Sequence, residues 1–430
     1  MGSIWARDGL LLGVQPSDPK PAILFTAFEP SGDDHASAII RVLKEWYPDL
    51  KIFGWGGRHM RDAGADIIEH TGDDAVMGVP GLQKIQEHRQ INAKIEHWLK
   101  DNPIAVHVPV DSPAANFPVC KLTKPQGAKV VHMVAPQLWA WAPWRIRKLR
   151  RLTNHVMCVL PFEPGWFTPR GVQATFVGHQ LFDQPLDLDA LDEQIKDWRT
   201  GPQQIALMPG SRPGEMRKNF PLLLGAYIKL AAEHPDMVGM VAATRKEIEP
   251  ELSKIAKDAG LDWPDSLSIT HAQTDAVIRW CSFALVVSGT VTLQIARQHK
   301  PMVIVYKSSR LIWSLAARWF IRTKFFTLPN IVAGREIVPE LVPHFAGAEP
   351  IADRAVQFLE NPEAYQEQVD NLKALTAQFS GHHASQNAAA LIAKFAGLEP
   401  IEQSQSDQSQ PDRDQTNPAP GVARAVRDPE

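Results

Sequence analysis

Short apolar runs that end in a turn and lead into a helical pattern recur along the chain, and this alternation most limits its fold. The run at 22–27 (AILFTA) is apolar throughout, which is typical of a strand buried on both faces of a parallel sheet. Runs at 106–111, 130–134, 205–208 and 283–287 have the same character. Since two such arrays follow one another, the sequence predicts an α/β protein with two Rossmann-like, doubly wound domains facing a cleft.

Composition excludes several classes of protein. The chain has 430 residues, 44% of them hydrophobic, which is enough for two buried cores. A formal net charge of −3 argues against a nucleic-acid binder. Cys120, Cys158 and Cys281 are far apart, so neither a disulfide framework nor a zinc site is expected, and no cofactor or metal site is evident. Without a leader or a long apolar segment, we expect a cytoplasmic protein, soluble or peripheral.

The stretch 207–217 (LMPGSRPGEMR) links a strand to a helix expected at about 217–233. Gly210, Ser211 and Arg212 occupy the turn, where backbone N–H groups and a guanidinium converge on a point that suits a phosphate. The alternative is an ordinary turn in which Ser211 caps the helix and Arg212 is a solvated surface charge.

A second phosphate-binding turn is predicted after the strand at 283–287. Its sequence, 288–294 (SGTVTLQ), places small residues and hydroxyls at the start of a helix. Further on, 328–336 (LPNIVAGRE) reads as a loop rich in hydrogen-bond donors.

Charged residues follow the first strand, in the stretch 29–35 (EPSGDDH). Gly32 allows a sharp turn, and Ser31 or Asp33 can cap a helix expected at 36–46. The acids and His35 at the mouth of this helix could position sugar hydroxyls, or they could be plain capping groups.

Asp111 ends the strand at 106–111, at the sheet edge where open α/β sheets bind ligands. There its carboxylate could accept a proton from a substrate hydroxyl. The alternative is that Asp111 caps the turn before Pro113.

Two stretches combine aromatic and basic residues. Trp139, Trp141 and Trp144 precede the cationic stretch 145–151, and 310–326 has a similar mixture. This composition is typical of a surface that meets anionic lipid headgroups. The alternative is a solvated helix with tryptophans in the core.

The remaining segments suggest the limits of the domains. Residues 183–192 read as a linker, 352–397 as helical, and the polar tail from about 398 as disordered. We expect a lead-in at 1–21, an N-terminal Rossmann-like domain at 22–184, a C-terminal Rossmann-like domain at 185–370, C-terminal helices at 371–397 and a disordered tail at 398–430.

Ten motifs, in order, resemble those of the lipid-A-disaccharide synthases, from about residue 22 to about residue 397. They are EPSGDDHA (29–36), GWGGRHMRDAG (54–64), MGVPGL (77–82), DSPAANF (111–117), APQLWAW (135–141), LPFE (160–163), GH (178–179), LMPGSRPGE (207–215), SGTVTLQ (288–294) and LPNIVAGRE (328–336).

The resemblance implies a GT-B glycosyltransferase whose C-terminal helices return to the N-terminal domain. Such an enzyme transfers 2,3-diacylglucosamine from UDP to 2,3-diacylglucosamine 1-phosphate, with inversion, at the cytoplasmic face of the inner membrane. Asp111 then matches the general base and Arg212 the diphosphate partner. The implied substrate-binding residues are Glu29, Ser31, Gly32, Asp33, His35, Asn116, Gly210, Ser211, Ser288, Gly289, Thr290, Thr292, Gln294, Asn330, Gly334, Arg335 and Glu336.

The chain departs from the family pattern at a few positions. Phe28 replaces a Gly, Ala114-Ala115 replace Asp-Phe, Gln294 replaces the Glu that holds ribose hydroxyls, and Pro343 replaces a Gln. The alternatives are therefore another GT-B UDP-sugar enzyme, such as a 2-epimerase, and a non-catalytic relative that binds lipid or nucleotide.

Overall fold

The computed structural model describes residues 21–71, 82–183, 185–310, 313 and 323–400. Several expectations lie outside these residues: the lead-in up to residue 20, the motif at 77–82 apart from its last residue, most of the aromatic-basic stretch at 310–326, and the tail from 401.

Seven strands form the first sheet, in the order β3-β2-β1-β4-β5-β6-β7. Their bounds are β1 Ala22–Ala27, β2 Lys51–Gly56, β3 Asp66–His70, β4 Val106–Val110, β5 Lys129–Met133, β6 His155–Cys158 and β7 Ala174–Phe176.

Six strands form the second sheet, in the order β10-β9-β8-β11-β12-β13. Their bounds are β8 Gln204–Met208, β9 Val238–Ala243, β10 Leu267–His271, β11 Phe283–Val287, β12 Met302–Lys307 and β13 Glu340–His344. This order repeats that of the first six strands, so the two sheets share one topology.

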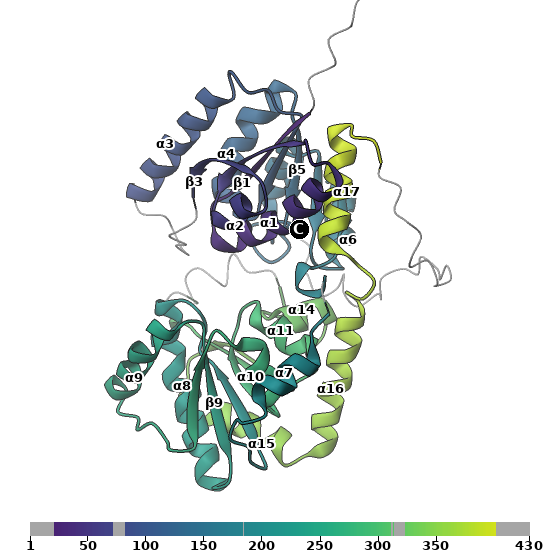
Figure 1. Ribbon diagram of the computed structural model, residues 1–430. Coiled ribbons are helices and arrows are strands. Elements are labelled where there is room, and N and C mark those ends of the chain that lie inside the picture. The colour runs from purple at the N-terminus through teal and green to yellow at the C-terminus, as the bar shows by residue number, and fades with distance from the viewer. Residues whose placement is uncertain (1–20, 72–81, 184, 311–312, 314–322, 401–430) are drawn as a thin grey trace, which may run out of the picture. The chain divides into compact units, whose positions relative to one another are not determined.

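Helices flank each sheet (Figure 1). Those between strands of the first sheet are α1 Pro30–Trp46, α2 Arg58–Asp62, α3 Leu82–Trp98, α4 Pro113–Thr123, α5 Ile146–Leu152 and α6 Glu163–Phe167. Those of the second sheet and the C-terminal stretch are α7 Leu188–Ile195, α8 Pro213–Glu233, α9 Glu249–Asp258, α10 Thr274–Trp280, α11 Val291–Arg297, α14 Leu328–Ala333, α15 Glu349–Leu359, α16 Pro362–Ala377 and α17 Ala384–Ala396.

The strands are parallel, and the central ones are buried, as their largely apolar sequences predict. Every residue of β4, β9 and β11 is buried, because helices cover both faces of each sheet. The predicted α/β class with two parallel sheets is confirmed.

Sequence patterns misplaced several elements. The helix expected at 36–46 begins at Pro30, because proline is well tolerated in the first turn of a helix. Residues 328–336 are mainly the helix α14 rather than a loop, and the expected linker at 183–192 contains the start of α7. Neither β3 nor β13 was predicted; their burial patterns are mixed, so their sequences lack a continuous apolar run.

By their contacts, the described residues fall into two compact units. One comprises residues up to Val130 and those from Ala389, and the other runs from Val131 to Ala388. The division passes through β5, so the domain limits expected from the sequence stay a prediction.

The C-terminal segment packs on elements of the first sheet. Asn387 in α17 donates from Nδ2 to the carbonyl of Val177, just after β7, at 2.9 Å. Beyond α17, the carbonyl of Glu399 accepts a hydrogen bond from the hydroxyl of Tyr47, at the end of α1. The chain therefore returns to its N-terminal elements.

Candidate functional site

The first group of candidate residues lies where the order of the first sheet reverses. β1 and β4 are parallel neighbours, yet β1 leads to β2 on one side and β4 leads to β5 on the other. Loops that leave such a pair of strands diverge and open a crevice at their carboxyl ends. Glu29 follows β1 and Asp111 follows β4, so both lie at this position.

A close backbone approach supports this crevice. A side chain at Gly32, in the first turn of α1, would place its Cβ 3.3 Å from that of Ala27 and 3.5 Å from the Val110 carbonyl. The start of α1 therefore packs against the ends of both strands, and Gly32 lies within the helix and not in the sharp turn that the sequence predicted.

The surroundings of Asp111 shift the pKa of its carboxyl group. Burial raises its pKa above the usual value, and the charge of Glu29 raises it further. A hydrogen bond from the backbone of Ser112 and the charge of His35 act in the opposite direction. Since a carboxylate with a raised pKa is a better proton acceptor, this environment suits a general base.

The turn that carries Asp111 is strained and held by side chains. Asp111 and Ser112 have φ of 50° and 34°, in the left-handed region that residues other than glycine rarely adopt. The Ser112 hydroxyl donates to Glu29 Oε1 at 2.5 Å, which ties the loop after β4 to the loop after β1.

Asn116 lies in α4, fully buried beneath this turn. Its Nδ2 donates to the carbonyls of Val110 at 3.0 Å and of Asp111 at 2.8 Å. The structure thus places Asn116 beside Asp111, but the amide group of Asn116 is hydrogen-bonded to the main chain.

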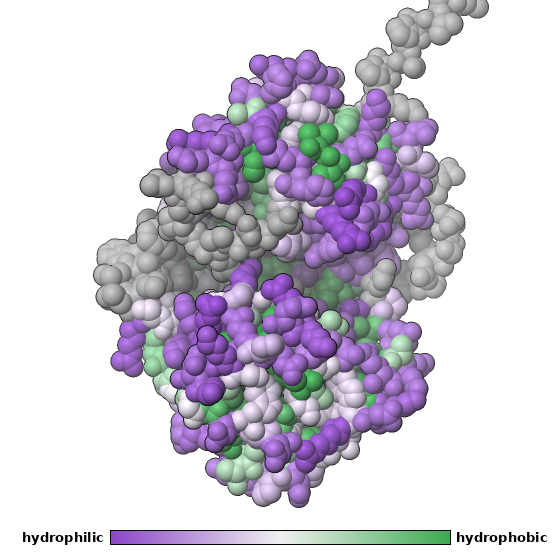
Figure 2. Space-filling model, turned by 60° about the vertical axis from the view of Figure 1, so that its left-hand side comes forward, coloured by the Kyte–Doolittle hydropathy of each residue, from purple (hydrophilic) through white to green (hydrophobic). Residues whose placement is uncertain are grey.

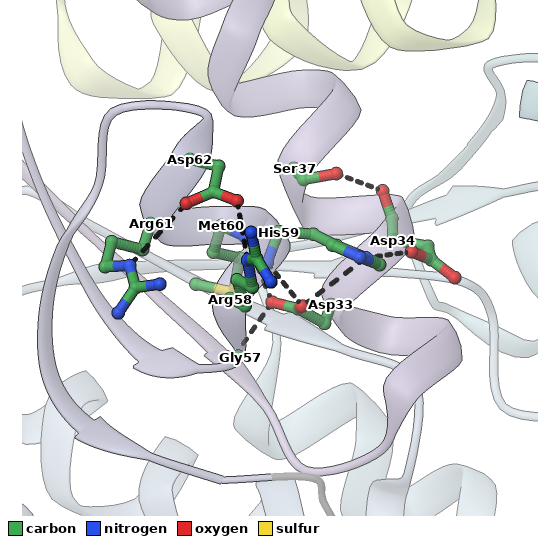
Figure 3. Close-up of polar contacts among 9 residues, drawn as sticks. All are labelled: Asp33, Asp34, Ser37, Gly57, Arg58, His59, Met60, Arg61 and Asp62. Atoms are coloured by element: carbon green, nitrogen blue, oxygen red, sulfur yellow. Dashed lines mark hydrogen bonds and ion pairs between the residues drawn. The ribbon is translucent and has the colours of Figure 1, made fainter.

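Asp33 has a structural partner that the sequence did not indicate (Figure 3). Its carboxylate accepts hydrogen bonds from the backbone N–H groups of Gly57 at 2.8 Å, His59 at 2.9 Å and Met60 at 3.2 Å. Asp33 therefore caps the N-terminus of α2, and not that of its own helix as expected.

The neighbouring acid, Asp34, is exposed and contacts His59. Its Oδ1 lies 2.5 Å from His59 Nδ1, with both side chains open to solvent (Figure 3). Ser31 is also exposed, whereas His35 is half-buried. Of the polar groups at the start of α1, Ser31, Asp34 and His35 are thus more accessible than Asp33.

The second group lies at the matching position of the second sheet, between β8 and β11. Gly210 follows β8 with φ of 92°, and a Cβ there would lie 3.7 Å from Val287 Cγ1 at the end of β11. Ser211 and Arg212 follow and are exposed, and Arg212 is the N-cap of the 21-residue helix α8. This strand, turn and helix match the arrangement predicted from the sequence.

Arg212 is oriented by an acid of its own helix. Its Nη1 lies 3.1 Å from Glu215 Oε1, one turn into α8, and about half of its side chain remains open to solvent. The guanidinium therefore combines a fixed partner with free donors, and it lies beside helical N–H groups that favour an anion.

The turn after β11 contributes a second set of small polar residues. Gly289 and Thr290 are exposed, and Ser288 and Gln294 are half-buried. Thr292 differs, since it is fully buried and donates to the Gly289 carbonyl at 2.7 Å. It therefore shapes this turn.

Asn330 in α14 is fully buried and uses its whole amide group within the protein. Nδ2 donates to the Val338 carbonyl and to Glu340 Oε2, while Oδ1 accepts from the N–H groups of Ile337 and Val338. These bonds fix the stretch after α14 against β13.

The other residues predicted in this stretch lie beyond α14. Gly334 ends the helix in the left-handed conformation, with φ of 67°. Arg335 and Glu336 are exposed, and Arg335 Nη2 donates to Asn371 Oδ1 at 2.6 Å. Arg335 is accordingly accessible but already paired with α16.

The aromatic-basic stretch divides into a buried and an exposed part. Trp139 is 1% exposed and donates to the buried Glu163 at 3.1 Å, so it is not part of a surface, contrary to expectation. Burial raises the pKa of Glu163 to about 7. Trp141 and Trp144 are 46% and 57% exposed, and the guanidinium of Arg145 lies 5.2 Å from the Trp141 ring centroid.

The helix α5 that follows is amphipathic. Leu149 and Leu152 are buried, while Arg147, Arg150 and Arg151 are exposed. On the face drawn in Figure 2, apolar areas are small and scattered among polar ones.

Two features are absent from the described part of the chain. Within it, no helix is both long and apolar enough to cross a membrane. In the same residues, no three acidic, histidine or cysteine side chains are grouped as metal ligands.

Comparison with known proteins identifies relatives that match almost the whole chain. The family model described as lipid-A-disaccharide synthetase matches residues 23–395. A lipid-A-disaccharide synthase of Geobacter sulfurreducens is 30% identical over 381 residues, covering 87% of this chain and 97% of the relative. One from Coxiella burnetii is 32% identical over 378 residues, covering 86% and 97%.

Solved structures share the fold at low sequence identity. A UDP-GlcNAc 2-epimerase from Neisseria meningitidis bound to UDP-GlcNAc has a TM-score of 0.54 and 13% identity, covering 87% of this chain and 99% of its own. MurG from Acinetobacter baumannii has a TM-score of 0.52 and 14% identity, covering 87% and 100%. The predicted GT-B fold is confirmed.

Proposed function

The chain belongs to the lipid-A-disaccharide synthetase family of glycosyltransferases, and from this premise we propose the reaction that it performs. It joins UDP-2,3-diacylglucosamine and 2,3-diacylglucosamine 1-phosphate into a β-1,6-linked disaccharide 1-phosphate, with inversion at C1 and release of UDP. Family membership favours this reaction over a 2-epimerase.

The observation that carries the proposal is the environment of Asp111 at the carboxyl end of β4. Its half-buried carboxyl group, with a raised pKa, accepts the proton of the acceptor 6-hydroxyl. The oxygen then attacks C1 from the face opposite UDP, and the bond between C1 and the diphosphate oxygen breaks. Glu29, between β1 and α1, and Ser31 and His35, in the first turns of α1, orient the acceptor sugar.

Arg212 binds the leaving diphosphate. Negative charge grows on that group as the bond to C1 breaks, and a guanidinium aimed at it stabilises the transition state. Ser211, Gly289 and Thr290 add hydroxyl and backbone N–H donors, and Gln294 binds the ribose hydroxyls without charge. Gly334, Arg335 and Glu336 complete the nucleotide side, while Asp33, Asn116, Thr292 and Asn330 shape the loops.

We propose that residues 22–184 form the acceptor domain, residues 185–370 the UDP-sugar domain and residues 371–397 the returning helices.

Positive charge at the diphosphate comes from Arg212, so the reaction needs no metal ion. Turnover that EDTA abolishes and Mg²⁺ restores would contradict this.

The acyl chains of both substrates require access to a lipid surface. Trp141, Trp144 and the exposed cations of α5 have the composition of a face that meets anionic headgroups. We place this face on the cytoplasmic leaflet of the inner membrane.

The test is an incubation of the purified protein with both substrates in detergent, with products read by mass spectrometry. We expect a disaccharide phosphate and UDP in equal amounts, and neither with Asp111→Asn. UDP binding without any product would favour a non-catalytic relative, whereas 2-epimerised sugar from plain UDP-GlcNAc would favour an epimerase.

A further inference from the structure

A chain of polar side chains runs through the apolar interior of the first sheet. Thr26 in β1, His107 in β4, and Asn116 and Thr123 in α4 are all fully buried. Buried polar groups are costly unless they are hydrogen-bonded, so such a chain calls for an explanation.

The hydrogen bonds give this chain a direction. Thr26 Oγ1 donates its hydrogen to Asn116 Oδ1 at 2.6 Å. His107 Nε2 lies 2.9 Å from the same hydroxyl oxygen, so this nitrogen is the donor of the contact. On the other side of the ring, Nδ1 lies 2.9 Å from Thr123 Oγ1.

The chain ends at the turn that carries Asp111. Asn116 donates from Nδ2 to the carbonyls of both Val110 and Asp111. Because Oδ1 is held by Thr26, the amide group cannot flip without losing all of these bonds. Through these two carbonyls, Asn116 therefore holds the peptide groups on either side of Asp111, whose φ of 50° is unfavourable.

We propose that Thr26 and His107 are positioning residues for Asp111, acting through Asn116. Being buried, they do not touch substrate; they fix the main chain of the turn and thus the direction of the Asp111 carboxyl group. The inference rests on the proposed role of Asp111 as general base.

The variant Thr26→Val tests this, because it keeps the shape of the side chain and removes its hydroxyl. We expect kcat to fall by about 10- to 100-fold, as a small displacement of a reacting group causes. The KM for the UDP-sugar stays within about twofold, because nucleotide binding does not depend on this turn. Thr26→Ser keeps the hydroxyl and restores most of kcat.

The pH profile separates positioning from general stability. A displaced Asp111 is more exposed to solvent, so its pKa falls. The loss of kcat at acidic pH therefore begins at a lower pH in Thr26→Val. Thr376→Val is the matched control, since its hydroxyl also pairs with a histidine, His299, at 3.1 Å. We expect Thr376→Val to lower the melting temperature and to leave kcat and its dependence on pH unchanged.

Asp111→Asn, measured in parallel, separates the two ideas. Full turnover of Asp111→Asn would overturn the base assignment and this inference with it. An inactive Asp111→Asn beside a fully active Thr26→Val would overturn the inference alone, as would a Thr26→Ser variant as impaired as Thr26→Val.

Discussion

The two sheets share one strand order, yet the residues at their reversal points have opposite chemical character. Between β1 and β4 lie the carboxyl groups of Glu29 and Asp111, joined through Ser112. Between β8 and β11 lie Arg212 and a set of hydroxyl and backbone N–H donors. In the proposed function, the same scaffold serves proton transfer in one place and anion binding in the other, so the loops carry the difference.

The backbones of the two turns differ as well. Gly210 has φ of 92° without strain, because glycine lacks a Cβ. The φ of Asp111 is also positive, and for a residue other than glycine this conformation costs about 1–3 kcal/mol. The buried bonds of Asn116 offset that cost. Precise placement is therefore built into the turn of Asp111, whereas Arg212 stays half exposed and adaptable.

The largest expected effect comes from Asp111→Asn. Asparagine has nearly the same shape and tolerates left-handed φ, so the turn survives while the proton acceptor is lost. We expect kcat to fall by about 10³-fold, within the range of general base catalysis. UDP affinity measured by calorimetry should stay unchanged. An equal loss of kcat and of UDP affinity would contradict the proposed difference between the two turns.

Arg212→Ala should weaken UDP binding, which Asp111→Asn leaves unchanged, and should lower kcat as well. Loss of charged hydrogen bonds to the diphosphate should weaken UDP binding by about 10- to 100-fold. Arg212→Lys should recover part of this, because a lysine keeps the charge without the planar fork of donors. Titration with UDP measures both variants, and unaltered UDP affinity in Arg212→Ala would refute the proposed contact.

Acidity should distinguish the two turns without mutation. Because burial raises the pKa of Asp111, kcat should decline by about tenfold per pH unit below that pKa, which lies above the ordinary value of about 4. UDP affinity should show no matching decline. A kcat that stays level down to pH 4 would argue against Asp111 as the base.

The same pKa predicts a stability effect of opposite sign. A raised pKa means that the folded protein favours the protonated carboxyl group, so its stabilising contribution is present below about pH 4. That contribution is lost as pH rises through the raised pKa. Melting temperatures across this range should reveal the trend, and Asp111→Asn should flatten it.

The smallest effect concerns membrane contact beside the first sheet. Replacing both Trp141 and Trp144 by Ala should reduce binding to anionic liposomes by about tenfold, since each exposed indole contributes about 1 kcal/mol or less at an interface. Sedimentation with vesicles measures this, and kcat in detergent should not change. Equal binding by the double variant would remove the surface from the proposal.

Much of the candidate site was predictable because it follows strands that are largely apolar. The strands before Asp111 and Arg212 are buried on both faces, and the residue that ends such a strand lies at the ligand-binding edge. The helix α8 after Arg212 was likewise expected from its apolar periodicity.

The partners of individual side chains were not predictable. Asp33 was expected to cap its own helix, yet it caps α2, 24 to 27 residues further along the chain. Trp139 was expected on a surface, yet it donates to Glu163 in the core. Both outcomes depend on how elements pack, which local sequence does not encode.

The sequence by itself therefore determined the fold class, most of the alternation of strands and helices along the chain, and the loops that carry Asp111 and Arg212, because hydrophobic periodicity and turn residues act locally. Only the tertiary structure decided which polar groups stay accessible to solvent and which are hydrogen-bonded within the protein. Thr26, His107 and Asn116 are up to 90 positions apart, and their hydrogen bonds exist only once β1, β4 and α4 have packed together.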